Sequence, residues 1–184
     1  AQASQIRFEH ITSEHGVSEN VVNCIFQDSK GFIWVGTNDG LNRYDGYSFR
    51  VFNPVPDDDQ SINSNLIFAV NEDLEGNIWI GTTGSGLNMF DPKSETFVSY
   101  QRDPKRTKTL SNDQIISLYT DRHGRIWVGT LDGLNVILPD AEPQDSNYIQ
   151  PIDIPVAAAL PVNEITEDKA GNIWLATRLG LYKC

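Results

Sequence analysis

One heptad occurs four times along the chain and constrains its fold more than any other feature. The copies are GFIWVGT at 31–37, GNIWIGT at 76–82, GRIWVGT at 124–130 and GNIWLAT at 171–177. Their tryptophans recur every 45 to 48 residues. A period of this length is typical of repeat proteins, in which one supersecondary unit stacks on the next. The sequence therefore predicts four copies of one structural unit.

Each heptad predicts a β-strand, because apolar side chains alternate with Trp and with a small residue. In the first copy Ile33 and Val35 share one face, and Trp34 and Gly36 share the other. A repeat cannot bury its apolar face alone, so we expect the tryptophans to pack against neighbouring repeats instead of stacking on a sugar ligand. Ala176 replaces the third Gly in the last copy, which indicates a need for close approach and not for positive φ. The structural tryptophans are Trp34, Trp79, Trp127 and Trp174.

An aspartate ends the apolar stretch before each heptad, three residues ahead of its first Gly. The segments DSKG, DLEG, DRHG and DKAG have the Asp and Gly positions of a tight turn, in which the Asp side chain accepts from nearby backbone amides. We interpret them as hairpin turns and assign their aspartates a structural role instead of a catalytic one. The four are Asp28, Asp73, Asp121 and Asp168.

A Gly-Leu pair follows each heptad after a short loop and opens a third strand. Turns then lead into a fourth strand, SFRVF at 48–52 and TFVSY at 96–100. Four strands in about 45 residues make one blade of a β-propeller. The predicted fold class is all-β: a β-propeller with four four-stranded antiparallel blades, sixteen strands and almost no helix, as part of a larger, roughly seven-bladed ring.

We expect one propeller domain over 1–184, with blades at 17–53, 62–101 and 110–152 and an incomplete blade at 160–184. Residues 5–12 alternate like a fourth strand and are interpreted as an orphan outer strand that precedes the first blade. They would pair with 181–184 if four blades close a ring. If the chain is a fragment of a larger ring, its end blades have bare apolar faces, and self-association as a dimer is expected.

The acidic composition excludes several partners. A net charge of −11 disfavours nucleic acid and anionic membrane surfaces, because phosphate binding needs clustered cations. The sequence lacks an apolar stretch long enough to span a membrane, so we expect membrane attachment only through a missing C-terminal part. Asp57, Asp59, Ser61 and Asn63 alternate like calcium ligands, but the Gly and Glu of such a loop are absent. We expect no cofactor and no metal site.

The loops after the heptads are the candidate binding residues. Connections from second to third strands and from fourth to first strands share one face of a propeller, and recognition is often placed on loops of a rigid scaffold. These loops vary among the repeats while their flanks do not. The candidates are Asn38, Asp39, Thr83, Ser85, Asp132 and Arg178.

A sugar-processing lyase or glycosidase is the alternative function, with carboxylates converging on the central channel. The repeat aligns Cys24, Ala69, Ser117 and Glu164 on the strands nearest that channel. One acid among four positions is weak support for paired-carboxylate catalysis, so no catalytic residue is assigned. A protein-interaction scaffold is a further alternative, although the regular WD dipeptide is absent.

The repeat unit resembles a known family. It is similar to the two-component-regulator propeller repeat, which is found in periplasmic sensor regions of Bacteroidetes hybrid histidine kinases. The shared pattern is Asn-x-Ile, a strand, Asp-x-x-Gly-x-Ile-Trp-Val-Gly-Thr, a loop and Gly-Leu-Asn-x-Tyr-Asp. The resemblance covers essentially the whole chain. It implies a non-catalytic periplasmic sensor module, an oligosaccharide ligand, and an output on transcription of glycan-utilisation genes. The kinase, receiver and DNA-binding elements of that family are not in this sequence.

Overall fold

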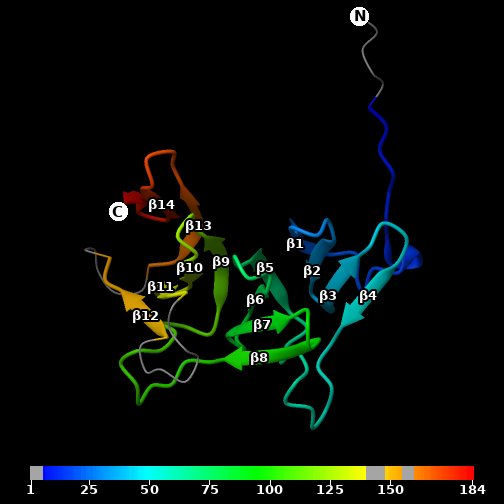
Figure 1. Cartoon of the computed structure of the whole chain (residues 1–184), viewed down its shortest axis with the longest axis horizontal. Coiled ribbons are helices and arrows are strands. Elements are labelled where there is room, and N and C mark those ends of the chain that lie inside the picture. Colours follow the sequence, from blue (N-terminus) through cyan, green and yellow to red (C-terminus); the bar gives the residue numbers. More distant parts are fainter. Residues whose placement is uncertain (1–5, 140–147, 155–159) are drawn as a thin grey trace, which may run out of the picture.

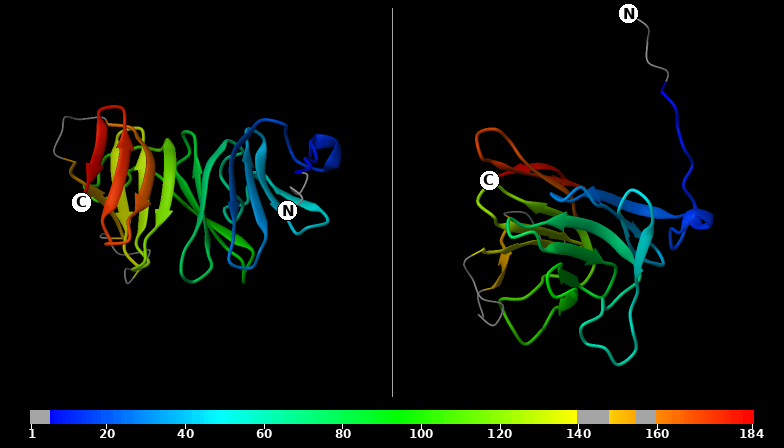
Figure 2. Two further views of the ribbon diagram at one scale, coloured as in Figure 1. Left: turned by 90° about the horizontal axis from the view of Figure 1, so that it is seen from above. Right: turned by 45° about the vertical axis from the view of Figure 1, so that its right-hand side comes forward.

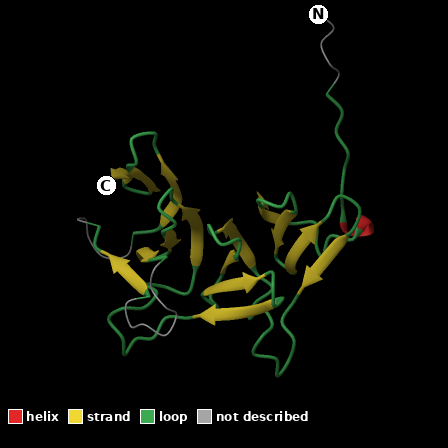
Figure 3. Ribbon diagram, viewed as in Figure 1, coloured by secondary structure: helices red, strands yellow, loops and turns green. Residues whose placement is uncertain are grey.

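The computed structural model describes residues 6–139, 148–154 and 160–184. Within these ranges the chain forms fifteen strands and one short 3-10 helix, η1 (Ser13–His15). Figure 3 shows the predominance of strand and loop. The all-β prediction is confirmed. No helix among these residues is long and apolar enough to cross a membrane.

The strands form four separate antiparallel sheets, each with its strands in chain order. Blade 1 contains β1 (Val22–Gln27), β2 (Ile33–Thr37), β3 (Gly40–Tyr44) and β4 (Phe49–Phe52). Blade 2 contains β5 (Ile67–Glu72), β6 (Ile78–Thr82), β7 (Leu87–Asp91) and β8 (Thr96–Tyr100). Blade 3 contains β9 (Ile115–Thr120), β10 (Ile126–Thr130), β11 (Gly133–Ile137) and β12 (Ile149–Ile152). Blade 4 contains β13 (Val162–Glu167), β14 (Ile173–Thr177) and β15 (Gly180–Lys183).

The blades stand side by side in an open arc (Figures 1 and 2). The first strand of each blade is the innermost, and contacts run in succession from β1 to β5, from β5 to β9 and from β9 to β13. Blades 1 and 4 lie at opposite ends of the arc. Each of the two end blades therefore has one face with no neighbouring blade.

The apolar core consists of three clusters, each between two adjacent blades. Trp34 packs with Ile67 and Phe90 of blade 2, and Trp79 packs with Ile115 of blade 3. Trp127 lies in the cluster formed with blade 4. The tryptophans of blades 1 to 3 are thus buried between blades, as the repeat predicts. Trp174 is only half-buried, because no blade covers its side of blade 4.

The third glycine of the heptad serves close approach between blades. A Cβ added to Gly36 would lie 2.7 Å from Ile67 Cγ2, and one added to Gly81 would lie 2.6 Å from Ile115 Cγ2. Neither glycine has positive φ. In blade 4 the same position is Ala176, against which no further inner strand packs. The prediction from the Gly-to-Ala exchange is confirmed.

The prediction of an orphan outer strand at 5–12 is wrong for residues 6–12, the part that the structure describes. Residues 6–12 form no strand and extend away from blade 1 (Figure 1). They do not pair with β15, which lies at the far end of the arc and remains the edge of a three-stranded sheet. An extended segment needs an adjacent strand edge to satisfy its backbone groups, and none is within reach here. The structure consequently has fifteen described strands instead of sixteen.

Candidate binding face

The loops after the heptads and the residues entering each inner strand lie together on one face, here called the rim face. The amide of Gly40 donates to the carbonyl of Asn65 at 2.8 Å, and the amide of Gly86 donates to that of Asp113 at 2.9 Å. Both bonds join the loop of one blade to the connector entering the next blade. At the first two junctions the backbone bonds therefore hold the rim-face loop of one blade to the connector of the next.

In blade 1 the rim face presents Asn38 and Asp39. The Asn23 side-chain amide donates to Asn38 Oδ1 at 2.9 Å and to the carbonyl of Ile67 at 3.0 Å. Asn65 Nδ2 donates to Asp39 Oδ1 at 3.1 Å. Both candidates are therefore linked to blade 2 or its entering connector, and the Asp39 side chain is exposed to solvent.

In blade 2 the candidates are held by backbone bonds, so their hydroxyls are not used for positioning. The amide of Thr83 donates to the carbonyl of Leu66 at 3.1 Å. The carbonyl of Ser85 accepts from Asn63 Nδ2 at 2.8 Å. Each side chain is partly exposed. The two hydroxyls can therefore exchange hydrogen bonds with a ligand.

Blades 3 and 4 contribute one charged candidate each, in addition to Asp39 of blade 1. Asp132 Oδ2 accepts from Asn112 Nδ2 at 2.8 Å, and the amide of Asp132 donates to Thr130 Oγ1. Arg178 is exposed, and no bond to its guanidinium occurs among the described residues. The structure places the six candidates on one face, with one or two on each blade, and does not gather them into one pocket.

The sequence interpretation missed the residues that position the rim face. Asn42, Asn88 and Asn135 are fully buried, and each accepts a bond from the connector entering its own blade. In blade 1 the distance from the Ser18 amide to Asn42 Oδ1 is 2.8 Å. The signal was visible as the Asn that follows Gly-Leu in the first three repeats. A buried amide in register over several repeats indicates a paired structural group.

The turn aspartates lie at the opposite ends of the blades from the rim face. Asp28 Oδ1 accepts from the amides of Lys30 and Phe32, and Asp28 Oδ2 accepts from Trp34 Nε1 at 2.8 Å. The same Trp-to-Asp bond is 2.9 Å long in the other three blades. The turn role follows the sequence interpretation, whereas the bond to the tryptophan was not anticipated. It fixes the indole ring between the blades.

The hydrogen bonds to the turn aspartates also change the pKa of two of these carboxyls. Burial alone would raise the pKa of Asp121, but hydrogen bonds from Trp127, Arg125 and nearby amides outweigh it and lower that pKa. Bonds from Trp174 and Asn172 lower the pKa of Asp168. A carboxyl whose folded-state pKa is depressed stabilises the fold above its unfolded value, near 3.9, and this contribution is lost as the pH falls through the folded value.

We therefore expect the free energy of unfolding to decrease as the pH falls below about 4. Asp121→Asn keeps an acceptor for the turn amides but cannot be protonated in this range. Its unfolding free energy should depend less on pH than that of the unmodified chain, measured by urea denaturation between pH 5 and 2. Equal slopes for the two proteins would contradict a depressed pKa at Asp121.

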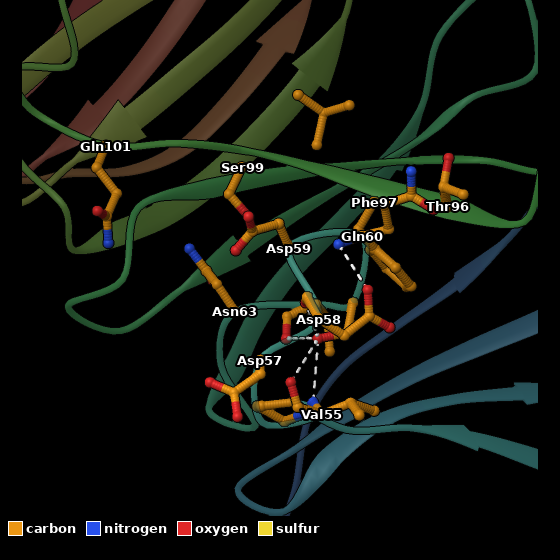
Figure 4. A pocket seen from close by; sticks show the side chains of 14 residues that line it. Val55, Asp57, Asp58, Asp59, Gln60, Asn63, Thr96, Phe97, Ser99 and Gln101 are labelled. Carbon is orange, nitrogen blue, oxygen red and sulfur yellow. Dashed lines mark hydrogen bonds between the residues drawn. The ribbon is translucent and has the colours of Figure 1, made fainter.

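A surface pocket of about 760 Å³ lies on blade 2 (Figure 4), and its lining residue Asn63 is the one that donates to the carbonyl of Ser85. It is lined by the connector from Pro54 to Asn63 and by β8 residues such as Thr96 and Ser99. Asp58 Oδ1 accepts from the amide of Gln60 at 2.9 Å, which stabilises a turn in the connector. None of the six candidates lines this pocket or the smaller one beside Tyr100 and Tyr148.

The four aligned positions on the innermost strands carry few side chains that could act in catalysis. Burial raises the pKa of the Cys24 thiol to about 11, so the thiol is neutral at physiological pH. Ser117 Oγ donates to the carbonyl of Val162 at 2.8 Å. Glu164 is exposed and stands opposite Ala176. These aligned positions provide one carboxylate, whereas glycoside hydrolysis ordinarily uses two.

Comparison with known proteins agrees with the repeat and the fold. The family model described as "Two component regulator propeller" matches residues 16–39 and 109–132. A protein named histidine kinase P4 from Formosa agariphila is 43% identical over 63 residues, which are 34% of this chain and 5% of that protein.

Two solved structures are extracellular domains of putative signalling systems from B. thetaiotaomicron. One, from a hybrid two-component system, has a TM-score of 0.68 at 23% identity and covers 95% of this chain and 30% of that chain. The other, from a one-component system, has a TM-score of 0.70 at 27% identity and covers 95% of this chain and 23% of that chain.

Virginiamycin B lyase from Staphylococcus aureus has a TM-score of 0.60 at 14% identity, covering 89% of this chain and 55% of that chain, which shows shared fold alone. The chain spans only a small part of the sensor relatives. Two of its segments match the two-component regulator propeller model, and its fold is similar to extracellular domains of putative signalling systems.

Proposed function

We propose that this chain is the ligand-sensing, periplasmic module of a hybrid histidine kinase and response regulator. Its ligand is an oligosaccharide, which binds on the rim face, and the signal reaches genes for glycan use. The kinase and transcriptional steps belong to other parts of such a protein. This chain would supply recognition.

The observation that carries the proposal is the chemistry of the rim face. Its variable positions carry amide, carboxylate, hydroxyl and guanidinium groups, and hydrogen bonds hold Asn38, Asp39 and Asp132 in place within a blade or to the next connector. Sugar hydroxyls both donate and accept hydrogen bonds, so they suit such a mixed set. A rigid frame also lowers the entropy lost when a ligand is bound.

The class of protein is supported by the relatives. The sensor structures are described as extracellular domains, and the sequence relative is named a histidine kinase. A periplasmic location fits an extracellular relative and an acidic domain. Since the chain spans 5% of the histidine kinase, the activity of the whole protein enters here only as part of the proposal.

We further propose that the chain itself has no catalytic activity, although a lyase shares its fold. Within the described residues, His10 and His123 are exposed, and His15 Nδ1 accepts from the amide of Thr12 at 3.1 Å. His15 Nδ1 also lies 3.0 Å from Thr12 Oγ1, a contact that caps the exposed η1 turn, and no carboxylate bonds this ring among the described residues, as a nucleophile–base–acid arrangement would require. A lyase or glycosidase activity of this chain would depend on the exposed carboxylate of Glu164.

The proposal is tested by screening the purified chain against a panel of defined oligosaccharides, followed by calorimetry on any that bind. Asp132→Ala and Arg178→Ala each remove a charged hydrogen-bonding group from the rim face. A charged hydrogen bond contributes about 1.5–3 kcal/mol, so we expect each variant to weaken binding by roughly 10- to 100-fold. Lys93→Ala, in the exposed β7–β8 turn, is the matched control and should bind normally.

Chromatography of the sugar after incubation addresses catalysis in the same samples. We expect the oligosaccharide to be recovered intact. Cleavage that is abolished by Glu164→Gln would overturn the non-catalytic proposal. Binding that survives both rim substitutions would place the ligand elsewhere.

A further inference from the structure

The surface pocket on blade 2 lies between the connector that runs from Pro54 to Asn63 and the outer strand β8 (Figure 4). Its volume of about 760 Å³ falls in the range of cavities that hold small organic ligands. Blade 2 has a neighbouring blade on each side, because β5 contacts both β1 and β9. The pocket therefore belongs to an internal blade, and its walls come from one connector and one strand.

Hydrogen bonds hold the connector wall of the pocket in place. The amide of Phe97 in β8 donates to the carbonyl of Gln60 at 2.8 Å, which fastens the connector to the strand. The amide of Val55 donates to Ser61 Oγ at 3.0 Å, and the Ser61 hydroxyl donates to the carbonyl of Asp58 at 2.9 Å. The wall is thus formed before a ligand arrives, which lowers the entropic cost of binding.

The strand wall differs from the same wall in the neighbouring blades. β8 places Ser99 opposite the buried Asn88, and the Ser99 hydroxyl donates to Asn88 Oδ1 at 2.8 Å. Val51 and Pro151 occupy the corresponding positions of blades 1 and 3. An apolar residue is therefore sufficient for the blade fold at this position. The hydroxyl is an additional polar group of blade 2, and its oxygen can still accept a hydrogen bond from a ligand.

The pocket carries negative charge that its lining does not neutralise. Asp57 and Asp59 are exposed, and their carboxylates accept no hydrogen bond and form no ion pair among the described residues. The described residues that line the pocket include no Lys, Arg or His. Val55 and Val98, which are 54% and 42% exposed, add apolar surface. A lining of this kind favours an organic cation over an anion or a fully apolar molecule.

Two free carboxylates suit an ammonium group better than a calcium ion, which takes about six to eight oxygen ligands. Oxygen-bearing residues alternate at 57, 59, 61 and 63 of the connector. The Ser61 hydroxyl is bonded within the connector, however, and Asn63 Oδ1 accepts from Asn88 Nδ2 at 2.8 Å. Of the alternating set, the two carboxylates remain for a ligand. An ammonium group has three donors and can pair with both.

We propose that this pocket binds an amino sugar. The ammonium group of the sugar pairs with the carboxylates of Asp57 and Asp59. The sugar hydroxyls exchange hydrogen bonds with Thr96 and Ser99 on the strand wall. This site is separate from the proposed rim-face site, so the two proposals can fail independently.

Three disaccharides that differ in one substituent of each ring test the role of charge: the glucosamine disaccharide, its N-acetylated form and cellobiose. Titration calorimetry on the whole chain at mildly acidic pH and low salt keeps the amines and the carboxylates charged. We expect the glucosamine disaccharide to bind about tenfold more tightly than the two neutral sugars, because exposed ion pairs contribute a modest free energy. Added salt should reduce this preference.

Substitutions then assign the preference to the pocket. Asp57→Asn and Asp59→Asn should each reduce the preference by about 3-fold, and the double variant should bind the three sugars equally. Ser99→Val introduces the residue of blade 1; it should weaken binding of all three sugars by about 3- to 10-fold and leave the preference unchanged. Glu75→Gln is the matched control, since it removes an exposed carboxylate of blade 2 that does not line the pocket. Circular dichroism checks that each variant is folded.

Equal affinities of the unmodified chain for the three sugars, or no binding of the glucosamine disaccharide, would overturn the proposal. A preference that persists in the double variant, or that is lost in Glu75→Gln, would do the same. Displacement of the sugar by calcium chloride would indicate a metal site instead. Loss of the preference in Asp132→Ala would place the amino sugar on the rim face and not in this pocket.

Discussion

Trp79→Ala should lower the free energy of unfolding by about 3–5 kcal/mol, the range for removing a large buried aromatic side chain. Trp79 is 1% exposed and lies in the cluster between blades 2 and 3, with its ring stacked on Tyr100 at 5.8 Å between centroids. The substitution also removes the Nε1 donor to Asp73 Oδ2. Urea denaturation followed by circular dichroism measures the loss.

Trp174→Ala is the matched control, because it removes the same side chain from the same repeat position. The Trp174 ring is only half-buried, so we expect the loss to be roughly half as large or less. Both variants are measured at several protein concentrations, which separates any association from the unfolding curve. Equal losses at the two positions would contradict the view that the tryptophans stabilise junctions between blades.

Gly129→Ala should lower the free energy of unfolding by about 1–3 kcal/mol through overpacking. A Cβ at this position would lie 2.7 Å from the carbonyl oxygen of Val162 and 3.1 Å from its Cβ, and it would also overlap Ser117 Oγ. The carbonyl belongs to β13, so blade 4 as a whole would have to move outward. Urea denaturation followed by circular dichroism measures the effect.

Ala176→Gly makes the reverse change at the equivalent position of blade 4. It relieves no internal clash and adds backbone freedom, so we expect the free energy of unfolding to fall by at most about 1 kcal/mol in the same measurement. A Gly129→Ala variant as stable as the unmodified chain would mean that the inner strands approach less closely than the structure indicates.

The strands and blades could be predicted from the sequence because the same pattern occurs in all four repeats. The alternation around Trp34 and the turn at Asp28 are weak signals alone, but four copies in register exclude most other interpretations. The need for close approach at Gly36 could also be read from a single exchange, Ala176. Comparison of the repeats thus predicted packing between blades, which the strand propensity of a single heptad does not.

Other features could not be predicted because they depend on turn geometry and strand pairing that the alternation pattern does not specify. The bond from Trp34 to Asp28 joins residues six apart, and its length depends on the turn geometry. Each inner strand has a bulge where it pairs with its neighbour, for example between Val22 and Cys24. Residues 6–12 have a strand-like pattern, but a strand forms only where a partner edge is available.

The rim candidates show the same limit. Variation among the repeats identified Asn38 and Asp39 as loop residues, and the structure places them on the shared face. The pattern did not predict that Asn38 is bonded to Asn23 of its own blade and that Asp39 is bonded to Asn65 of the connector to blade 2. Fixed side chains of this kind suit recognition, because their geometry is set before a ligand arrives.

Hydrogen exchange of the chain with and without a bound oligosaccharide is the most direct test of the proposed sensing role. Ligand should slow exchange in the loops at 38–39, 83–86, 131–132 and 178–179, since these form the rim face. The turns that carry Asp28, Asp73, Asp121 and Asp168, at the far ends of the blades, should be unchanged. Protection confined to the connector at 54–63, or no protection with any oligosaccharide of the panel, would contradict the account.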